Sequence, residues 1–334
     1  MYKMGYILIT GGAGFIGSNL SKKLLMLGEK IIILDNFNDY YDVSIKEKNI
    51  SEINDILKQN DFANDNLVLY KGDIRDTILL DEIFKKYKIK IIIHLAAMGG
   101  VRYSIQEPLL YQDVNICGTI KLLEKCKEYN VKKIISASSS SVYGNNKKVP
   151  FNEDDRVDFQ ISPYGATKKA GELICYTYHH LYDINCICLR FFTVYGPGQR
   201  PDLAIHKFID CILNDKSIPV FGDGSTKRDY TYIDDITEGI AGSMRLAMSG
   251  EKIFEIINIG NSSPISLNEM ISTIEQVIGK KAKINRLPMQ QGDVDITFAD
   301  IKKAKRLINY NPQTSFYNGV ENFIKWYIVN LKKR

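Results

Sequence analysis

Residues 6–17 read YILITGGAGFIG, and this stretch decides the fold. The apolar run Tyr6–Thr10 is typical of a buried strand, and an amphipathic helix pattern begins at Phe15. The glycines between them allow a tight turn and the close approach of a pyrophosphate to the helix N-terminus. The stretch therefore predicts a dinucleotide-binding turn, with an ordinary glycine-rich turn as the alternative. The expected cofactor contacts are Gly11, Gly14, Phe15, Ile16 and Gly17.

Outward from this turn, short apolar runs alternate with longer amphipathic ones. The runs are nearly continuous in Ile, Leu and Val, which is typical of parallel strands buried on both faces. We therefore expect an α/β fold, a Rossmann-type doubly wound parallel sheet with a smaller C-terminal α/β substrate-binding part. The expected strands are Tyr6–Thr10, Lys30–Leu34, Leu67–Tyr70, Ile91–Leu95, Lys133–Ala137 and Ile184–Leu189, and the expected helices are Phe15–Leu27, Thr77–Lys86, Pro108–Tyr129 and Pro163–Tyr182.

Two acidic residues follow predicted strands. Asp35 ends the second strand, where a carboxylate binds the adenosine ribose and repels a 2′-phosphate, so NAD is favoured over NADP. Asn36 follows it, and no arginine is near in the sequence. Asp73, beside Ile74 after the third strand, is expected to reach the adenine amine, with a helix N-cap as the alternative.

The chain after residue 190 has a less regular pattern, rich in glycine and proline. We expect an NAD-binding domain at 1–190, with returning segments near 230–260, and a mainly substrate-binding part at 191–334. Residues 42–66 are expected to form an inserted helix and loop. Further short helices are expected near Leu203–Asn214, Asp235–Met248, Leu267–Gly279, Ile301–Ile308 and Tyr317–Leu331.

Tyr164 and Lys168 lie four residues apart on a predicted helix, so both side chains share one face. Ser139 lies at the end of the fifth predicted strand. A tyrosine base needs its pKa lowered from about 10, and a neighbouring ammonium favours the phenolate. These three residues are the predicted catalytic set, and Tyr164 and Lys168 are also expected to contact the cofactor. The alternative is a core tyrosine beside a surface lysine.

Composition argues against several other classes of protein. The net charge of +5 is mild, and no basic stripe interleaved with aromatic residues suggests nucleic-acid binding. No apolar run is long enough for a membrane span, and no signal-peptide pattern is visible at the start. The six cysteines lack zinc spacing, so we expect no metal site. Free buried thiols are typical of a protein in a reducing cytoplasm.

Several further stretches resemble the extended short-chain dehydrogenase/reductase family, and within it the nucleotide-sugar epimerases, especially bacterial UDP-glucuronate 4-epimerases. The resemblance covers essentially the whole chain. Residues 38–42 (NDYYD) and 287–290 (LPMQ) carry it most specifically. Residues 198–201 (GQRP) and 220–224 (VFGDG) are more similar to a broader group of UDP-sugar epimerases, so they leave the sugar open. Other matching stretches are 94–97 (HLAA), 100–104 (GVRYS), 138–144 (SSSSVYG) and 190–197 (RFFTVYGP).

The resemblance implies a homodimeric, NAD-dependent enzyme that epimerises a UDP-sugar at C4 through a 4-keto intermediate. UDP-glucuronate, converted to UDP-galacturonate, is the implied reaction. The alternatives are a UDP-glucose or UDP-N-acetylglucosamine 4-epimerase, a UDP-glucuronate decarboxylase, a net oxidoreductase, and a non-catalytic NAD-binding sensor. The resemblance also implies cofactor contacts from Leu95, Ala96, Ala97, Asn115, Phe191 and Phe192, and a substrate contact from Thr193.

Hydroxyl and guanidinium groups are the expected substrate contacts. The serines at 138–141 offer hydroxyls to a uronate carboxylate, whereas related decarboxylases and 4,6-dehydratases carry an acidic residue in this stretch. A polar strand end that caps backbone groups is the alternative for Ser140 and Ser141. Gln290, where UDP-glucose epimerases of the family usually carry arginine, also favours the glucuronate group. The expected substrate contacts are Arg102, Ser139, Ser140, Ser141, Arg200, Arg228 and, at the uridine ribose, Asp293.

Overall fold

The computed structural model describes residues 5–60, 62–289 and 294–331. Its main layer is a seven-stranded sheet in the order β10-β6-β5-β4-β1-β2-β3, and each neighbouring pair is parallel. This confirms the predicted α/β fold class. The strands are β1 (Tyr6–Thr10), β2 (Ile31–Asp35), β3 (Leu67–Lys71), β4 (Ile89–His94), β5 (Lys133–Ser139), β6 (Asn185–Phe191) and β10 (Phe254–Ile259).

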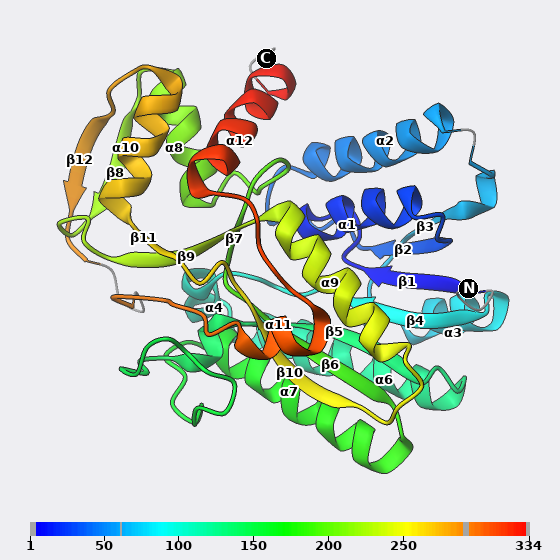
Figure 1. Cartoon of the computed structure of the whole chain (residues 1–334). Coiled ribbons are helices and arrows are strands. Elements are labelled where there is room, and N and C mark those ends of the chain that lie inside the picture. The colour runs from blue at the N-terminus through cyan, green and yellow to red at the C-terminus, as the bar shows by residue number, and fades with distance from the viewer. Residues whose placement is uncertain (1–4, 61, 290–293, 332–334) are drawn as a thin grey trace.

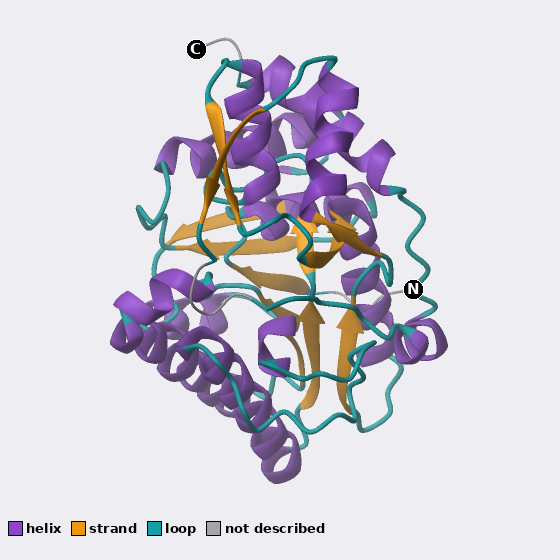
Figure 2. Ribbon diagram, turned by 90° about the vertical axis from the view of Figure 1, so that its left-hand side faces the viewer, coloured by secondary structure: helices purple, strands orange, loops and turns teal. Residues whose placement is uncertain are grey.

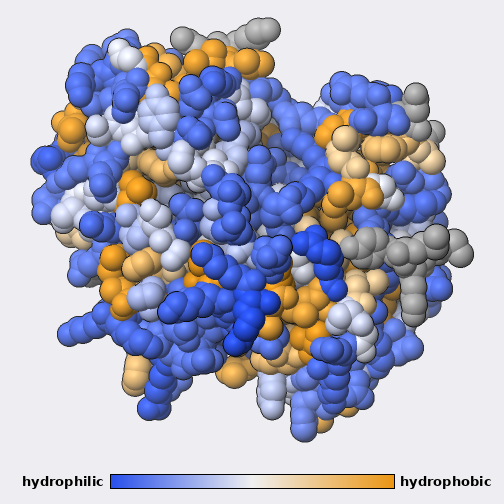
Figure 3. Space-filling view, viewed as in Figure 1, coloured by the Kyte–Doolittle hydropathy of each residue, from blue (hydrophilic) through white to orange (hydrophobic). Residues whose placement is uncertain are grey.

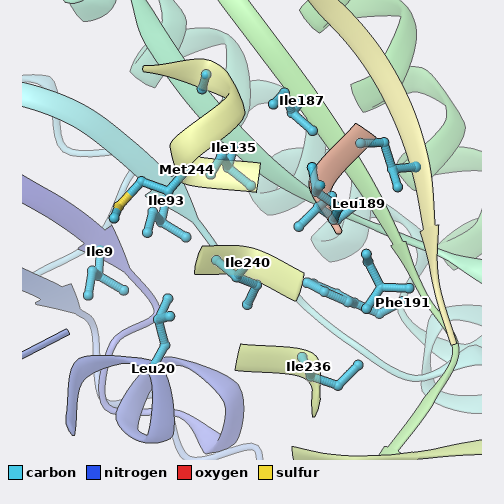
Figure 4. Packing of buried hydrophobic residues seen from close by; sticks show 14 of the residues in the cluster. Ile9, Leu20, Ile93, Ile135, Ile187, Leu189, Phe191, Ile236, Ile240 and Met244 are labelled. Atoms are coloured by element: carbon cyan, nitrogen blue, oxygen red, sulfur yellow. The ribbon is translucent and has the colours of Figure 1, made fainter. Parts of the chain in front are cut away.

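Helices cover both faces of this sheet (Figure 1). Alternate strand residues point to opposite faces, so Ile7 and Ile9 pack with one set of helices and Leu8 with the other. Figure 4 shows the first packing layer, where Leu20, Ile240 and their neighbours meet the sheet. The first face carries α1 (Phe15–Met26), α2 (Val43–Gln59), α9 (Ile233–Ala247) and α11 (Lys302–Ile308); the second carries α3 (Thr77–Lys86), α5 (Pro108–Gln112), α6 (Gly118–Glu128) and α7 (Pro163–Tyr182).

A smaller lobe built from the C-terminal half lies beyond the carboxyl ends of the main strands (Figures 1 and 2). Its own apolar core packs three helices against two small sheets, ordered β11-β9-β7 and β12-β8. Its elements are β7 (Thr193–Tyr195), α8 (Ala204–Leu213), β8 (Ser217–Phe221), β9 (Lys227–Tyr232), β11 (Pro264–Ser266), α10 (Leu267–Ile278), β12 (Lys283–Leu287) and α12 (Phe316–Asn330).

Two features were not predicted in detail. The expected loops of the small lobe contain five short strands, and all but β8, such as KRDYTY in β9, lack the apolar runs of the main sheet. Helix α4 (Val101–Gln106) is only six residues long, too short for a periodic pattern. The returning segment holds α9, which packs on the main sheet, and β10, which extends it.

Hydrophilic side chains cover most of the face shown in Figure 3, which lies over α9 and α11. Among the described residues, no helix is both long and apolar enough to cross a membrane.

The first helix packs unusually close to the first strand. A Cβ atom on Gly17 would lie 2.3 Å from the Gly11 carbonyl oxygen and 2.7 Å from Gly12 Cα. These are rigid backbone atoms, so a side chain at this position would force the helix away from the turn. The glycine at position 17 is therefore required by packing.

We predict that Gly17→Ala lowers the stability of the protein by about 1–3 kcal/mol, because strain outweighs the gain of about 1 kcal/mol that alanine brings to a helix. Gly171→Ala in α7 is the matched control, since an added methyl group there meets open space. Thermal melting of both variants tests this. Equal melting temperatures for the two variants would show that the close packing is not needed.

Candidate active site

A cleft of about 480 Å³ opens between the carboxyl edge of the main sheet and the small lobe. This volume is typical of small-molecule sites, which measure about 300–1,000 Å³. Ligands of doubly wound sheets bind at this edge, where the strand order reverses between β4 and β1. The cleft is lined by these predicted residues: Gly11, Gly14, Phe15, Ile16, Gly17, Asp35, Asn36, Asp73, Ile74, Leu95, Ala96, Ala97, Ser139, Ser140, Ser141, Tyr164, Lys168, Phe191, Phe192, Thr193 and Arg200.

The glycine turn forms one wall of the cleft. Gly14 is the N-cap of α1 and has no side chain to accept hydrogen bonds from the first turn of the helix. Gly11 has a φ of 71°, a left-handed conformation that glycine adopts without strain. A positive helix end with free N–H groups therefore faces the cleft, which suits the pyrophosphate of a dinucleotide.

Asp35 lies beside this turn and is held in a fixed orientation. Its carboxylate accepts hydrogen bonds from the backbone of Ala13, at 3.1 Å, and of Phe37, at 2.9 Å. It also pairs with Lys46 of α2, whose Nζ lies 3.4 Å from Oδ1. Both side chains are buried: Asp35 is 5% exposed and Lys46 is 6% exposed. Lys46 was not predicted from the sequence, because no pattern in the residues between it and Asp35 indicates that α2 folds back over the end of β2.

Asp73 is held in the cleft by Arg75 and Asn36. Arg75 donates from Nε and Nη2, each at 2.8 Å, and these bonds lower the pKa of Asp73 to about 2. Asn36 donates to the same carboxylate at 2.9 Å. The N-cap of α3 is Asp76, so the alternative that Asp73 caps this helix is wrong.

Tyr164, Lys168 and Ser139 come together at the centre of the cleft. Ser162 caps α7 by accepting a hydrogen bond from Gly165, and Pro163 starts the helix, which places Tyr164 in its first turn. The Lys168 ammonium lies 5.9 Å from the centre of the Tyr164 ring and donates to the Ala137 carbonyl at 2.8 Å. The three side chains therefore lie together in the cleft, and their catalytic role stays a prediction.

Burial opposes the charged forms of both titratable members of this set. It raises the pKa of Tyr164, while hydrogen bonding to Ser139 and the charge of Arg200 lower it. Burial also lowers the pKa of Lys168 to about 8. Lys168 is therefore still mainly protonated at neutral pH, where its charge favours the tyrosinate.

Tyr111 is a further residue of the site that the sequence argument missed. Its fully buried ring packs edge-on against Tyr164, with centroids 6.1 Å apart. Its hydroxyl lies 2.8 Å from the Gly99 carbonyl oxygen and 2.9 Å from that of Gly100. Tyr111 thus holds both the catalytic ring and the loop that follows β4. Its place in the predicted helix at 108–129 was the only available signal.

Arg200 reaches the cleft from the loop after β7. Its guanidinium forms a fork with Asp202, at 3.0 and 2.8 Å, and lies 5.0 Å from the centre of the Tyr40 ring. Tyr40 lines the cleft too. Arg200 therefore brings a positive charge to the cleft wall beside Tyr40 and Gly99, where it could attract an anionic substrate group.

Two other predicted substrate contacts lie elsewhere. Arg102 on α4 is exposed and stacks on Phe221, 5.2 Å from its ring centre, and Arg228 on β9 donates to the Lys227 carbonyl. Neither of them lines the cleft. Asp293 lies outside the described residues, as does Gln290. Helix α4 directs Arg102 toward the small lobe, which sequence spacing does not reveal.

Asn115 lies behind the cleft wall and does not line it. Its amide bonds both backbone groups of Met98, at 2.8 and 3.0 Å, and the Thr167 hydroxyl at 3.1 Å. Asn115 therefore supports the wall of the cleft by joining the loop after β4 to α7, and its contact with the cofactor stays a prediction.

The model of the family described as GDP-mannose 4,6 dehydratase matches residues 8–323 of this chain. A UDP-glucuronate 4-epimerase of Thermodesulfobacterium geofontis is 44% identical over 330 residues, which are 98% of each protein.

Two solved structures are similar over nearly the whole chain. A UDP-glucuronic acid 4-epimerase from Bacillus cereus, in complex with UDP-glucuronic acid and NAD, is 37% identical with a TM-score of 0.88, covering 96% of this chain and 98% of that one. A UDP-glucose 4-epimerase from Thermotoga maritima, with UDP-glucose, is 31% identical with a TM-score of 0.86, covering 98% and 99%. The chain therefore belongs to the nucleotide-sugar epimerases of the extended short-chain dehydrogenase/reductase family.

Proposed function

We propose that this chain is an NAD-dependent UDP-sugar 4-epimerase that interconverts UDP-glucuronate and UDP-galacturonate. One observation carries the proposal: a dinucleotide-binding turn and the Ser139/Tyr164/Lys168 set line the same cleft. The relatives whose names include UDP-glucuronate 4-epimerase support the choice of sugar.

The cleft fits NAD. The N-terminus of α1 offers N–H groups to the pyrophosphate, and Asp35 offers a carboxylate to the adenosine ribose. Asp73 and Ile74, which line the cleft, would contact the adenine, and Lys168 would hold the nicotinamide ribose. When bound, NAD would accept a hydride from C4 of the sugar and return it later.

The side chains of the cleft then handle the proton. Tyr164, as the phenolate, accepts the proton of the sugar 4-hydroxyl and later returns it. Lys168 favours the phenolate by its charge, and Ser139 hydrogen-bonds the 4-oxygen. The 4-keto sugar rotates between the two hydride transfers, so the hydride returns to the opposite face of C4. The net reaction is redox-neutral.

The serine turn after β5 supports a uronate substrate. Ser140 and Ser141 begin a 3₁₀ helix that lines the cleft, and both offer hydroxyl groups to a carboxylate. Ser138 is not available, because its hydroxyl already donates to Glu172 at 2.7 Å. Among the described lining residues, the carboxylates are Asp35 and Asp73, both at the adenosine end. Among the described lining residues near the serine turn, no carboxylate would therefore repel a uronate or assist its decarboxylation.

The test is proton NMR of UDP-glucuronate with the purified protein and no added reductant. We expect UDP-galacturonate to appear without release of carbon dioxide or net NADH. Tyr164→Phe is the control: without the base it loses turnover, by about 10²-fold or more, and still binds NAD.

Conversion of UDP-glucose or UDP-N-acetylglucosamine alone would contradict the uronate proposal and leave the mechanism intact. A pentose product would contradict the argument from the serine turn. No turnover by either the wild-type protein or Tyr164→Phe, with NAD still bound, would favour a sensor over an enzyme.

We also propose that the protein is a homodimer. Large apolar side chains are exposed on α4, α5 and α7, which pack on one another. Burying this face against a second copy would remove the apolar area from water. The exposed side chains are Ile105, Leu109, Leu173, Tyr176 and Leu181.

We further propose that the protein works in a reducing cytoplasm, because its six cysteines are all free thiols.

Leu173→Glu, at the centre of α7, is expected to convert the dimer to a monomer, because a carboxylate would be buried unpaired in the interface. Ile78→Glu is the matched control: Ile78 is exposed on α3, outside this face, and its charge is expected to leave the dimer intact. Sedimentation equilibrium distinguishes the two states. A monomeric wild-type protein would refute the proposal.

A further inference from the structure

A buried ion pair lies directly beneath the serine turn. Glu172 of α7 and Arg190 of β6 are each only 1% exposed. The Glu172 carboxylate accepts hydrogen bonds from Arg190 Nε at 2.8 Å and Nη2 at 2.9 Å, a two-pronged geometry. Glu172 follows Tyr164 by two helical turns and Lys168 by one, so it belongs to the helix that carries the predicted base.

The same carboxylate also holds the strand that carries Ser139. Ser138, the preceding residue of β5, donates its hydroxyl to Glu172 Oε1 at 2.7 Å. Tyr164 and Lys168 lie on α7 and Ser139 lies on β5, so the catalytic set is divided between these two elements. Glu172 is a direct polar link between them.

Arg190 extends this link to the serine turn itself. Its Nη1 donates to the Tyr143 hydroxyl at 2.9 Å, and that hydroxyl donates to Asn258 Oδ1 of β10 at 2.7 Å. Tyr143 ends the 3₁₀ helix that begins at Ser140. The network therefore joins α7, β5, β6, β10 and the turn that carries the proposed uronate contacts.

A gain in stability does not explain why such a pair is buried. Removing two charges from water is costly, and apolar residues of similar volume often serve stability as well or better. Fixed hydrogen-bond directions at both ends of the pair do impose one arrangement of the elements, which apolar packing imposes less strictly. The geometry of the site is the property that this pair controls.

We propose that Glu172 and Arg190 are positioning residues, which fix the serine turn and β5 against α7 so that Ser139 stays within reach of Tyr164. This inference rests on the catalytic set proposed above. Neither residue lines the cleft; both act through Ser138, Tyr143 and the helix. Proton transfer demands such support, since a displacement of about 1 Å can cost about 10²-fold in rate.

The test compares Glu172→Gln with Glu29→Gln. Glu29 forms a second buried ion pair with Lys90, each side chain 8% exposed, near the amino ends of the strands. Both substitutions remove the carboxylate of a buried ion pair, so both are expected to lower the melting temperature. Only Glu172→Gln is expected to lower kcat, by about 10- to 100-fold, with KM for UDP-glucuronate changed less than about threefold.

The pH dependence of kcat/KM gives a second readout. Hydrogen bonding to Ser139 lowers the pKa of Tyr164. Displacing Ser139 removes that effect, so the rising, acidic limb of the profile moves to higher pH in Glu172→Gln and not in Glu29→Gln. The other groups that face Tyr164 are Lys168 on its own helix, Tyr111 on α5 and Arg200 from the loop after β7, and neither substitution removes any of them.

The two variants also define the contrary result. If Glu172→Gln matches Glu29→Gln in kcat and in pH profile, the pair is only structural and the inference is overturned. If Glu172→Gln fails to fold, Ser138→Ala decides, because it removes the link to β5 and keeps the ion pair: a lower kcat with a shifted limb supports the inference, and a wild-type profile overturns it. An active Tyr164→Phe would instead refute the proposed catalytic set itself.

Discussion

The burial of a tyrosine and a lysine side by side is the constraint on which the rest of the site depends. Burial disfavours both charged forms: it raises the pKa of Tyr164 and lowers that of Lys168 to about 8. A base is useful only if the phenolate is accessible, so the surroundings must offset this cost. Hydrogen bonding from Ser139 and the positive charge of Arg200 do so in part.

The fold supplies these groups from distant parts of the chain because parallel strands end at one edge. Glycines after β1 open the helix end, Asp35 ends β2, and Ser139 ends β5. The loop after β7 then adds Arg200 to the lining of the cleft. Polar residues behind the wall, such as Asn115, hold the lining segments in place.

The amino-acid sequence was sufficient to predict six of the seven strands of the main sheet, because they are largely continuous apolar runs. The seventh strand, β10, lies in the expected returning segment but was not predicted as a strand. The sequence also predicted Asp35, Tyr164, Lys168 and Ser139, since these lie at fixed positions relative to strands and helices. Lys46 was missed and Arg102 misplaced, because their partners are set by how α2 and α4 pack, which spacing along the chain does not encode. Four of the five short strands of the small lobe lacked an apolar run to reveal them.

The central claim is that hydrogen leaves C4 of the sugar and returns to the same carbon within one closed cleft. The most direct test uses UDP-glucuronate deuterated at C4, incubated with the protein in ordinary water and followed by NMR and mass spectrometry. The account predicts UDP-galacturonate that keeps deuterium at C4. Product with protium at C4 would show exchange with solvent and contradict the account.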